Sequence, residues 1–175
     1  MNARTLGVLL ALVSVGGLAA TGGWYHGHQD LQRSRTQLVV STLEPMAALL
    51  KDNEGIIAEL QAEPYAEKDN GVLESYLIKI RRDGVAKHAD MKERLDQLAE
   101  NNTAIVTLIK AYATQPKTGT FMTEGDKFRN YASAWRDRWN SVMELFMAGG
   151  NYPVSSVPFP EAFSAAVQAE IVAAR

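Results

Sequence analysis

The feature that most constrains the fold is a run of residues, mostly apolar, that recur every three or four positions through the middle of the chain. Such spacing places its members along one stripe of an α-helix, and a stripe sustained over several heptads resembles a coiled-coil seam. The seam runs through Leu73, Leu77, Ile80, Gly84, His88, Met91, Leu95, Leu98, Asn102, Ile105, Ile109 and Tyr112. An unbroken helix of this length would measure about 60 Å. Asp83–Gly84 is the point where it would be interrupted, because glycine inside a helix costs about 1 kcal/mol.

Helical periodicity also covers the regions on both sides of this seam. On the N-terminal side, apolar residues share a helix face at Leu43, Met46, Leu50, Ile57 and Leu60. Pro45 either begins this helix or bends one that already runs from Leu31, because proline fits a first helical turn but bends a helix interior. On the C-terminal side, Thr123 with Asp126 three residues later predicts a helix start. The helix after it has one apolar face, formed by Phe128, Tyr131, Trp135, Trp139, Val142 and Phe146.

Turn-forming residues separate these segments. They include Pro64 with residues 67–71, Gln115–Pro116, and Gly149–Gly150. A proline-rich loop at residues 151–160 then leads to a last alanine-rich helix, and no segment shows the period-two alternation of a strand. The sequence therefore predicts an all-α fold, in which an N-terminal transmembrane (signal-anchor) helix precedes an antiparallel three- to four-helix bundle.

Residues 5–25 carry no charged side chain, and a helix of this length can cross about 30 Å of hydrocarbon. A cleaved signal peptide is the competing interpretation, with small residues at 17–23 as the cleavage region. The length of the run, and Trp24–Tyr25 where interfacial aromatic residues belong, favour a retained anchor. We therefore divide the chain into residues 1–25, an anchor or signal peptide in contact with membrane lipid, and residues 26–175, an extracytoplasmic helical domain.

The flanking charges give little orientation signal, because Arg4 precedes the apolar segment while Arg33 and Arg35 follow it. A short tail before a signal-like segment normally remains cytoplasmic. We therefore expect a single-pass protein of the inner membrane whose C-terminal domain lies in the periplasm.

Small residues inside the apolar segment suggest a helix-packing surface. Gly16 and Ala20 are four positions apart, and Gly17 is four positions before Thr21. This spacing lets another transmembrane helix approach closely. The alternative is that Gly16, Gly17 and Ala20 are merely the small residues of a signal peptide.

Composition excludes several classes of function. The net charge is −2 and basic residues alternate with acidic ones, so we expect no nucleic-acid partner. The chain has no cysteine, which excludes thiolate zinc sites, iron–sulfur clusters and cysteine nucleophiles. The GxSxG, P-loop, GxGxxG and HExxH patterns are also absent. We therefore expect no enzyme activity and no cofactor.

Three polar residues that follow the apolar segment resemble a metal site only weakly. His26 and Asp30 are four positions apart, but His28 would point elsewhere on a helix. We therefore assign no metal site and interpret these residues as interfacial polar groups.

Two polar residues lie on the seam itself. His88 has no second ligand three or four positions away, so we interpret it as a core or core-edge histidine rather than as a metal ligand or pH switch. A single buried asparagine commonly fixes helix register, and this is the role that we predict for Asn102. Both residues are therefore candidates for setting helix register.

Four aromatic residues are candidate partner contacts. Trp135 and Trp139 project from one helix face, where they belong either to the core or to an aromatic anchor for a partner. Tyr152 and Phe159 lie in the proline-rich loop, which would lose little entropy on docking.

These features favour a non-catalytic accessory or scaffold subunit of a larger membrane protein complex, with other membrane subunits as partners. A ligand-sensing or ligand-binding helical bundle is the first alternative, by analogy of architecture with extracytoplasmic sensor domains. A cleaved, soluble binding or chaperone-like protein is the second. A small-molecule ligand is compatible with the sequence, but no motif supports one.

Overall fold

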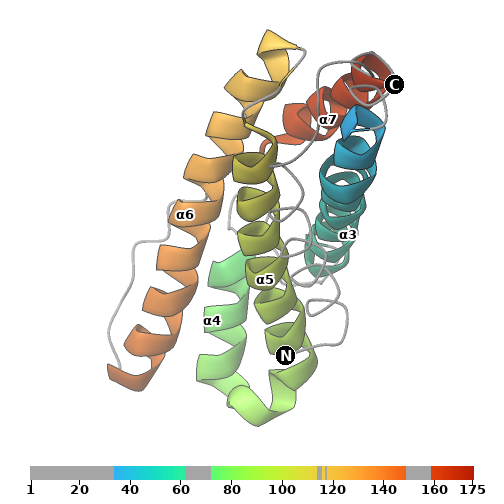
Figure 1. Cartoon of the computed structure of the whole chain (residues 1–175). Helices are drawn as coiled ribbons and strands as arrows, with labels where there is room; N and C mark the ends of the chain where they lie inside the picture. The colour runs from blue at the N-terminus through green and yellow to red at the C-terminus, as the bar shows by residue number, and fades with distance from the viewer. Residues whose placement is uncertain (1–33, 62–71, 114–115, 117, 149–158) are drawn as a thin grey trace, which may run out of the picture.

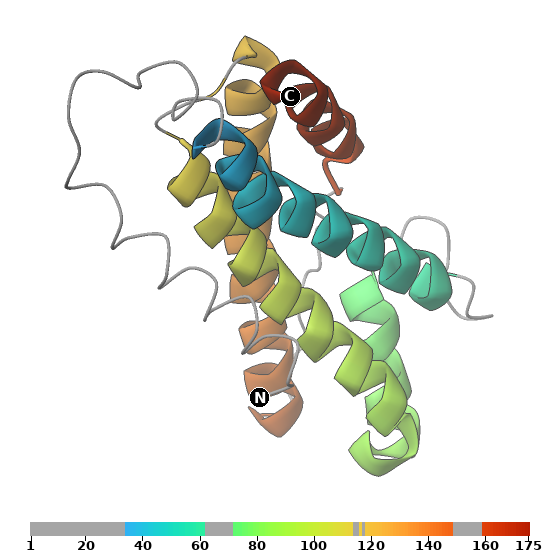
Figure 2. The ribbon, with the colours of Figure 1, turned by 45° about the vertical axis from the view of Figure 1, so that its right-hand side comes forward.

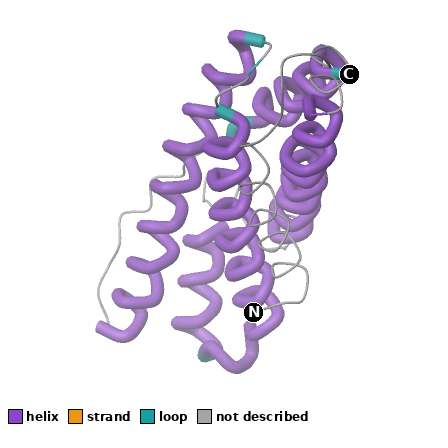
Figure 3. The backbone as a smooth tube through the Cα atoms, in the orientation of Figure 1, coloured by secondary structure: helices purple, strands orange, loops and turns teal. Residues whose placement is uncertain are grey.

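The computed structural model describes residues 34–61, 72–113, 116, 118–148 and 159–175. Within these residues every regular element is helical, so the described part of the chain is all-α as predicted (Figure 3). The expected membrane segment, with Gly16, Gly17 and Ala20, lies outside the described residues, and so does Tyr152. None of the helices in the described ranges is long and apolar enough to cross a membrane.

The helices pack as a bundle (Figures 1 and 2). Their bounds are η1 (Val39–Leu43), α3 (Glu44–Gln61), α4 (Val72–Asp83), η2 (Val85–His88), α5 (Ala89–Tyr112), α6 (Gly119–Ala148) and α7 (Glu161–Ala174). Helix α5 contacts both α3 and α6 and runs antiparallel to each of them. Helix α7 packs against α3 and α6 at one end of the bundle, and α4 packs against α6 towards the other end.

The apolar members of the sequence seam contribute the buried face of α4 and α5 to the bundle core. The following seam residues are buried: Leu73, Leu77, Ile80, Met91, Leu95, Leu98, Ile105, Ile109 and Tyr112. Full burial of a leucine or isoleucine side chain contributes about 1.5–3 kcal/mol relative to exposure. The seam therefore identifies the buried face of both α4 and α5.

The structure interrupts the seam at Asp83–Gly84, the point of interruption that the sequence indicates. Helix α4 ends at Asp83, Gly84 adopts φ +85° and ψ 154°, and the chain turns back through η2 into α5. This backbone conformation is essentially restricted to glycine, because a Cβ atom strains it. Gly84 therefore ends the helix, and an extended coiled coil across residues 73–112 does not form.

Pro45 lies inside a continuous helical stretch rather than at the start of a helix. Residues 34–38 are already helical and continue through the π-helical turn η1 into α3. The Glu44 N–H donates to the Val39 carbonyl, which is the wider spacing of a π-turn. Proline lacks an N–H and its ring clashes with the carbonyl four residues earlier, so a local widening accommodates Pro45 inside the helix.

Helix α6 begins earlier than the sequence signal at Thr123 predicts. It starts at Gly119, and the Thr118 hydroxyl accepts a hydrogen bond from the Phe121 N–H at 3.3 Å, as an N-cap does. Thr123 lies inside the helix, where its hydroxyl donates to the Gly119 carbonyl. The predicted capping pair of Thr123 and Asp126 is therefore wrong.

Candidate functional site

A cluster of polar side chains lies between α3 and α5, where the contact between two packed helices would usually be apolar. Asn53 on α3 is fully buried, and Asn101 and Asn102 on α5 are 8% and 2% exposed. Asn53 follows Leu50 by three positions, so it falls on the same inward stripe of α3. We call Asp52, Asn53, Gln97, Asn101 and Asn102 the amide cluster.

Direct hydrogen bonds connect the amide cluster across the two helices. Asn53 Nδ2 donates to Asn102 Oδ1, and Asn101 Nδ2 donates to Asn53 Oδ1, both at 2.9 Å. Asn101 Nδ2 and Gln97 Nε2 each donate to Asp52 Oδ2, also at 2.9 Å. Because buried amides must be paired, these bonds satisfy polar groups that the contact between α3 and α5 takes out of water.

Pairing in the cluster is incomplete. Asn102 Nδ2 is buried and makes no hydrogen bond of normal geometry with a described residue, although the Asn102 side chain lies close enough to the Tyr131 hydroxyl to oppose the rise in its pKa. Leaving a buried donor unpaired costs about 1–3 kcal/mol. The structure thus places Asn102 on the buried seam beside a partner asparagine on α3, while its role in fixing register stays a prediction.

An open groove adjoins the cluster on the surface between α3 and α5. It has a volume of about 300 Å³ and is lined by Ala48, Lys51, Asp52, Gly55, Ile56, Glu59 and Arg94. At one end Arg94 pairs with Glu59 at 3.2 Å. Asp52 belongs to both the groove and the amide cluster, so the amides of Gln97 and Asn101 orient a carboxylate that solvent can reach.

Gly55 keeps this groove open. A Cβ atom added at Gly55 would meet no heavy atom within 4 Å outside the local helix backbone. The position therefore has room for a side chain, and glycine there costs helix stability without any backbone requirement. We take the groove and the amide cluster together as the candidate functional site.

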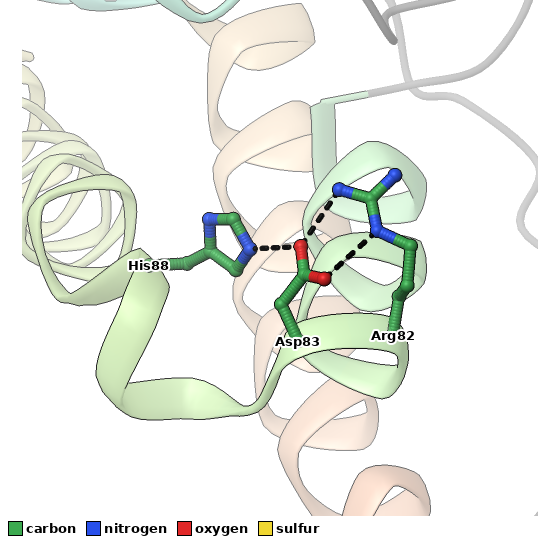
Figure 4. A network of polar contacts seen from close by, with 3 residues as sticks. All are labelled: Arg82, Asp83 and His88. Atoms are coloured by element: carbon green, nitrogen blue, oxygen red, sulfur yellow. Dashed lines mark hydrogen bonds and ion pairs between the residues drawn. The ribbon is translucent and has the colours of Figure 1, made fainter.

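His88 lies at the corner between α4 and α5, where it contacts the side chain of Asp83 (Figure 4). His88 Nε2 is 3.0 Å from Asp83 Oδ2, and Arg82 donates to both oxygens of the same carboxylate. The hydrogen bonds from Arg82, followed by the one from His88, hold the pKa of the Asp83 carboxyl well below its usual range. His88 is half-buried, so it lies at the edge of the bundle core rather than inside it.

Glu170 is a fully buried acid on α7. Its Oε1 accepts the Tyr112 hydroxyl at 2.7 Å, and its Oε2 accepts the Thr118 N–H and hydroxyl at 2.8 and 2.7 Å. Burial, and then the bond to Glu170, raise the pKa of Tyr112. This network joins the C-terminal helix to the connection between α5 and α6, which is a structural role.

The structure places Trp135 and Trp139 in the core. Their exposed fractions are 6% and 7%, their ring centroids are 6.1 Å apart, and Trp139 Nε1 donates to Asp96 at 3.1 Å. Lys92 also pairs with Asp96. Burial of both rings favours the core interpretation over an exposed anchor for a partner.

Phe159 is half-buried and contacts other aromatic rings of the bundle. Its ring packs edge-on against Tyr131 at 5.5 Å and against Phe128 at 6.2 Å. Such edge-to-face pairs add about 0.5–1.5 kcal/mol beyond the area that they bury. Phe159 therefore joins the loop to α6, and only its exposed part is available to a partner.

Within the described residues, no group of three or more His, Asp or Glu side chains could hold a metal ion. The three residues considered at positions 26, 28 and 30 lie outside them. No protein-family model, curated protein or solved structure matches the chain. The candidate site therefore rests on the geometry of its own residues.

Sequence reasoning identified Asn102 but missed its partners. Asn53 could have been found, because it interrupts the apolar stripe of Leu50 and Leu60 at an inward position. Lys51 and Asp52 could not have been singled out in this way, because charged residues on a helix ordinarily lie on its solvent-exposed face.

Proposed function

We propose that this chain is a non-catalytic, membrane-anchored accessory or scaffold subunit of a larger membrane protein complex. It contributes a helical bundle on the periplasmic side of the inner membrane, and other membrane subunits are its partners. The single observation that carries the proposal is the uncharged segment at residues 5–25, which precedes an all-helical domain.

The chemistry of the chain supports a structural rather than a catalytic role. Four buried polar residues make contacts between elements: Asn53, Asn101 and Asn102 join α3 to α5, and Glu170 joins α7 to Tyr112 and Thr118. Contacts of this kind favour a bundle with one fixed arrangement, which suits a scaffold. The sequence also lacks the common catalytic patterns.

The proposal is tested by native mass spectrometry of the C-terminally tagged chain after extraction in mild detergent. The expected species is a heteromeric assembly in which this chain retains its N-terminus. A lone chain without residues 1–25 would overturn the proposal and would favour a soluble exported protein. A lone chain that keeps residues 1–25 would contradict the proposed complex but would remain consistent with the membrane anchor.

A matched pair of variants tests the packing surface of the apolar segment. Gly16→Leu keeps the segment apolar but blocks close approach of a second helix, so it is expected to lower recovery of the partner. Val13→Leu changes the same segment without removing a small residue and is expected to leave recovery unchanged. Equal recovery with both variants would exclude Gly16 from the interface.

A further inference from the structure

The groove between α3 and α5 presents two opposite charges that no other described residue neutralises. Lys51 forms no ion pair within the described part of the chain. Asp52 receives only neutral donors, from Gln97 and Asn101, and both of them use Oδ2. Its Oδ1 accepts no hydrogen bond from a described residue, and Asp52 forms no ion pair with any of them.

The other two charges of the groove are already paired with each other. Glu59 and Arg94 form an ion pair of 3.2 Å across the two helices. The groove as a whole is thus neutral, with one charge of each sign left over on adjacent positions of α3. A purely anionic or purely cationic ligand would satisfy only one of the two.

Size and lining restrict the ligand further. Ligand sites commonly range from about 300 to 1,000 Å³, and this groove, at about 300 Å³, lies at the lower limit. Ala48, Gly55 and the nearly buried Ile56 supply the apolar part of its lining. The ligand must therefore be small and carry a short apolar portion between its charged groups and Ile56.

We infer that the groove binds a small zwitterion of amino-acid size, with its ammonium group at Asp52 and its carboxylate at Lys51. The amides of Gln97 and Asn101 hold the Asp52 carboxylate in place before the ligand arrives, which reduces the entropy lost on binding. This inference goes beyond the proposed function and does not depend on it, since a subunit can bind a ligand with or without its partners.

The test is calorimetric titration of the full chain, in mild detergent, with each standard amino acid in turn. The amino acid that binds best is then compared with its methyl ester, which lacks the carboxylate charge, and with its N-acetyl derivative, which lacks the ammonium charge. We expect each derivative to bind at least about tenfold more weakly, because each leaves one groove charge unpaired.

Variants assign each ligand charge to one side chain. Asp52→Asn is expected to weaken the amino acid and its methyl ester but to leave the N-acetyl derivative unchanged. Lys51→Met is expected to weaken the amino acid and the N-acetyl derivative but not the ester. Gly55→Leu should abolish binding of all three, because its side chain fills the groove while the helix is retained.

Exposed residues elsewhere supply matched controls. Asp137→Asn and Lys110→Met make the same charge changes away from the groove and are expected to leave binding unchanged. The inference is overturned if no amino acid binds, if both derivatives bind as well as the parent, or if Gly55→Leu retains full affinity. Partner recovery in native mass spectrometry is measured separately, so failure here is distinguishable from failure of the accessory-subunit proposal.

Discussion

Asn53 Nδ2 donates a hydrogen bond of 2.9 Å to Asn102 Oδ1, and this bond joins two side chains that are 49 positions apart in the sequence. Both side chains are almost completely buried. Any shift of α3 along α5 would unpair these two amides, so we expect the pair to favour one register of the two helices.

Replacement of Asn53 tests this relationship. Asn53→Leu removes the donor to Asn102 and the acceptor of Asn101, so it should lower the free energy of unfolding by about 1–3 kcal/mol. Urea unfolding followed by circular dichroism measures the loss. Because removal of both partners is less costly than removal of one, the double variant Asn53→Leu with Asn102→Leu should recover part of it. Additive losses in the double variant would show that the two amides act independently.

Two glycines should respond in opposite directions to the same substitution. Gly84→Ala places a Cβ atom on a residue with φ +85° and should destabilise the protein by about 1–3 kcal/mol. Gly55→Ala lies inside α3 with open space around it and should stabilise the protein by about 0.5–1 kcal/mol. Thermal unfolding of both variants measures the difference. Equal stability of Gly84→Ala and the parent would mean that the corner does not need a glycine.

The N-terminus of α6 can be tested with two threonines. Thr118→Ala removes the cap of α6 and one bond to Glu170, and it should cost about 1–2 kcal/mol. Thr123→Ala removes only an exposed bond to the Gly119 carbonyl and should change stability by less than about 0.5 kcal/mol. If unfolding experiments reversed this order, the helix would begin where the sequence signal placed it.

The start of α6 was misplaced because local and tertiary signals conflict. Pro116 and Gly119 are poor helix formers, so the segment that contains them resembles a turn followed by a later helix start. In the structure Phe121 is fully buried and its ring lies 5.2 Å from that of Tyr112. Burial of this ring outweighs the low helix propensity of its neighbours, and no local pattern contains that information.

Apolar periodicity alone located the core, because a helical stripe must be buried whichever helix it meets. It could not show that Gly84 reverses the chain, since the spacing continues unbroken across the corner. The groove was equally out of reach. The groove depends on how α3 is rotated against α5. This rotation brings Arg94 beside Glu59, and it leaves Lys51 and Asp52 exposed in the groove.

Because Tyr131 is buried, we expect the protein to lose stability at alkaline pH. Burial raises the pKa of Tyr131, so the folded protein keeps its phenol proton at a pH where the unfolded chain loses it. The unfolded state then binds fewer protons than the native state, and the free energy of unfolding falls as the pH rises above about 10. Below that pH the contribution of Tyr131 is fully present.

Tyr131→Phe is the matching variant. It keeps the ring that packs against Phe128 but cannot ionise, so its stability should fall less steeply above about pH 10. Denaturant unfolding measured at several alkaline pH values compares the slopes. Identical slopes for the variant and the parent would show that Tyr131 ionises equally in both states.

The proposed membrane topology can be tested by cysteine labelling. Because the chain contains no cysteine, an introduced cysteine is its only thiol. Ala173 is an exposed residue of the last helix, so Ala173→Cys supplies a single accessible thiol on the bundle. If the bundle lies in the periplasm, a membrane-impermeant maleimide should label this thiol in cells whose outer membrane has been permeabilised and whose inner membrane is intact.

Asn2→Cys, before the apolar segment, should be labelled only after the inner membrane is disrupted. The reverse pattern would place the bundle in the cytoplasm, and labelling of both thiols in intact spheroplasts would mean that residues 5–25 do not hold the N-terminus across the membrane.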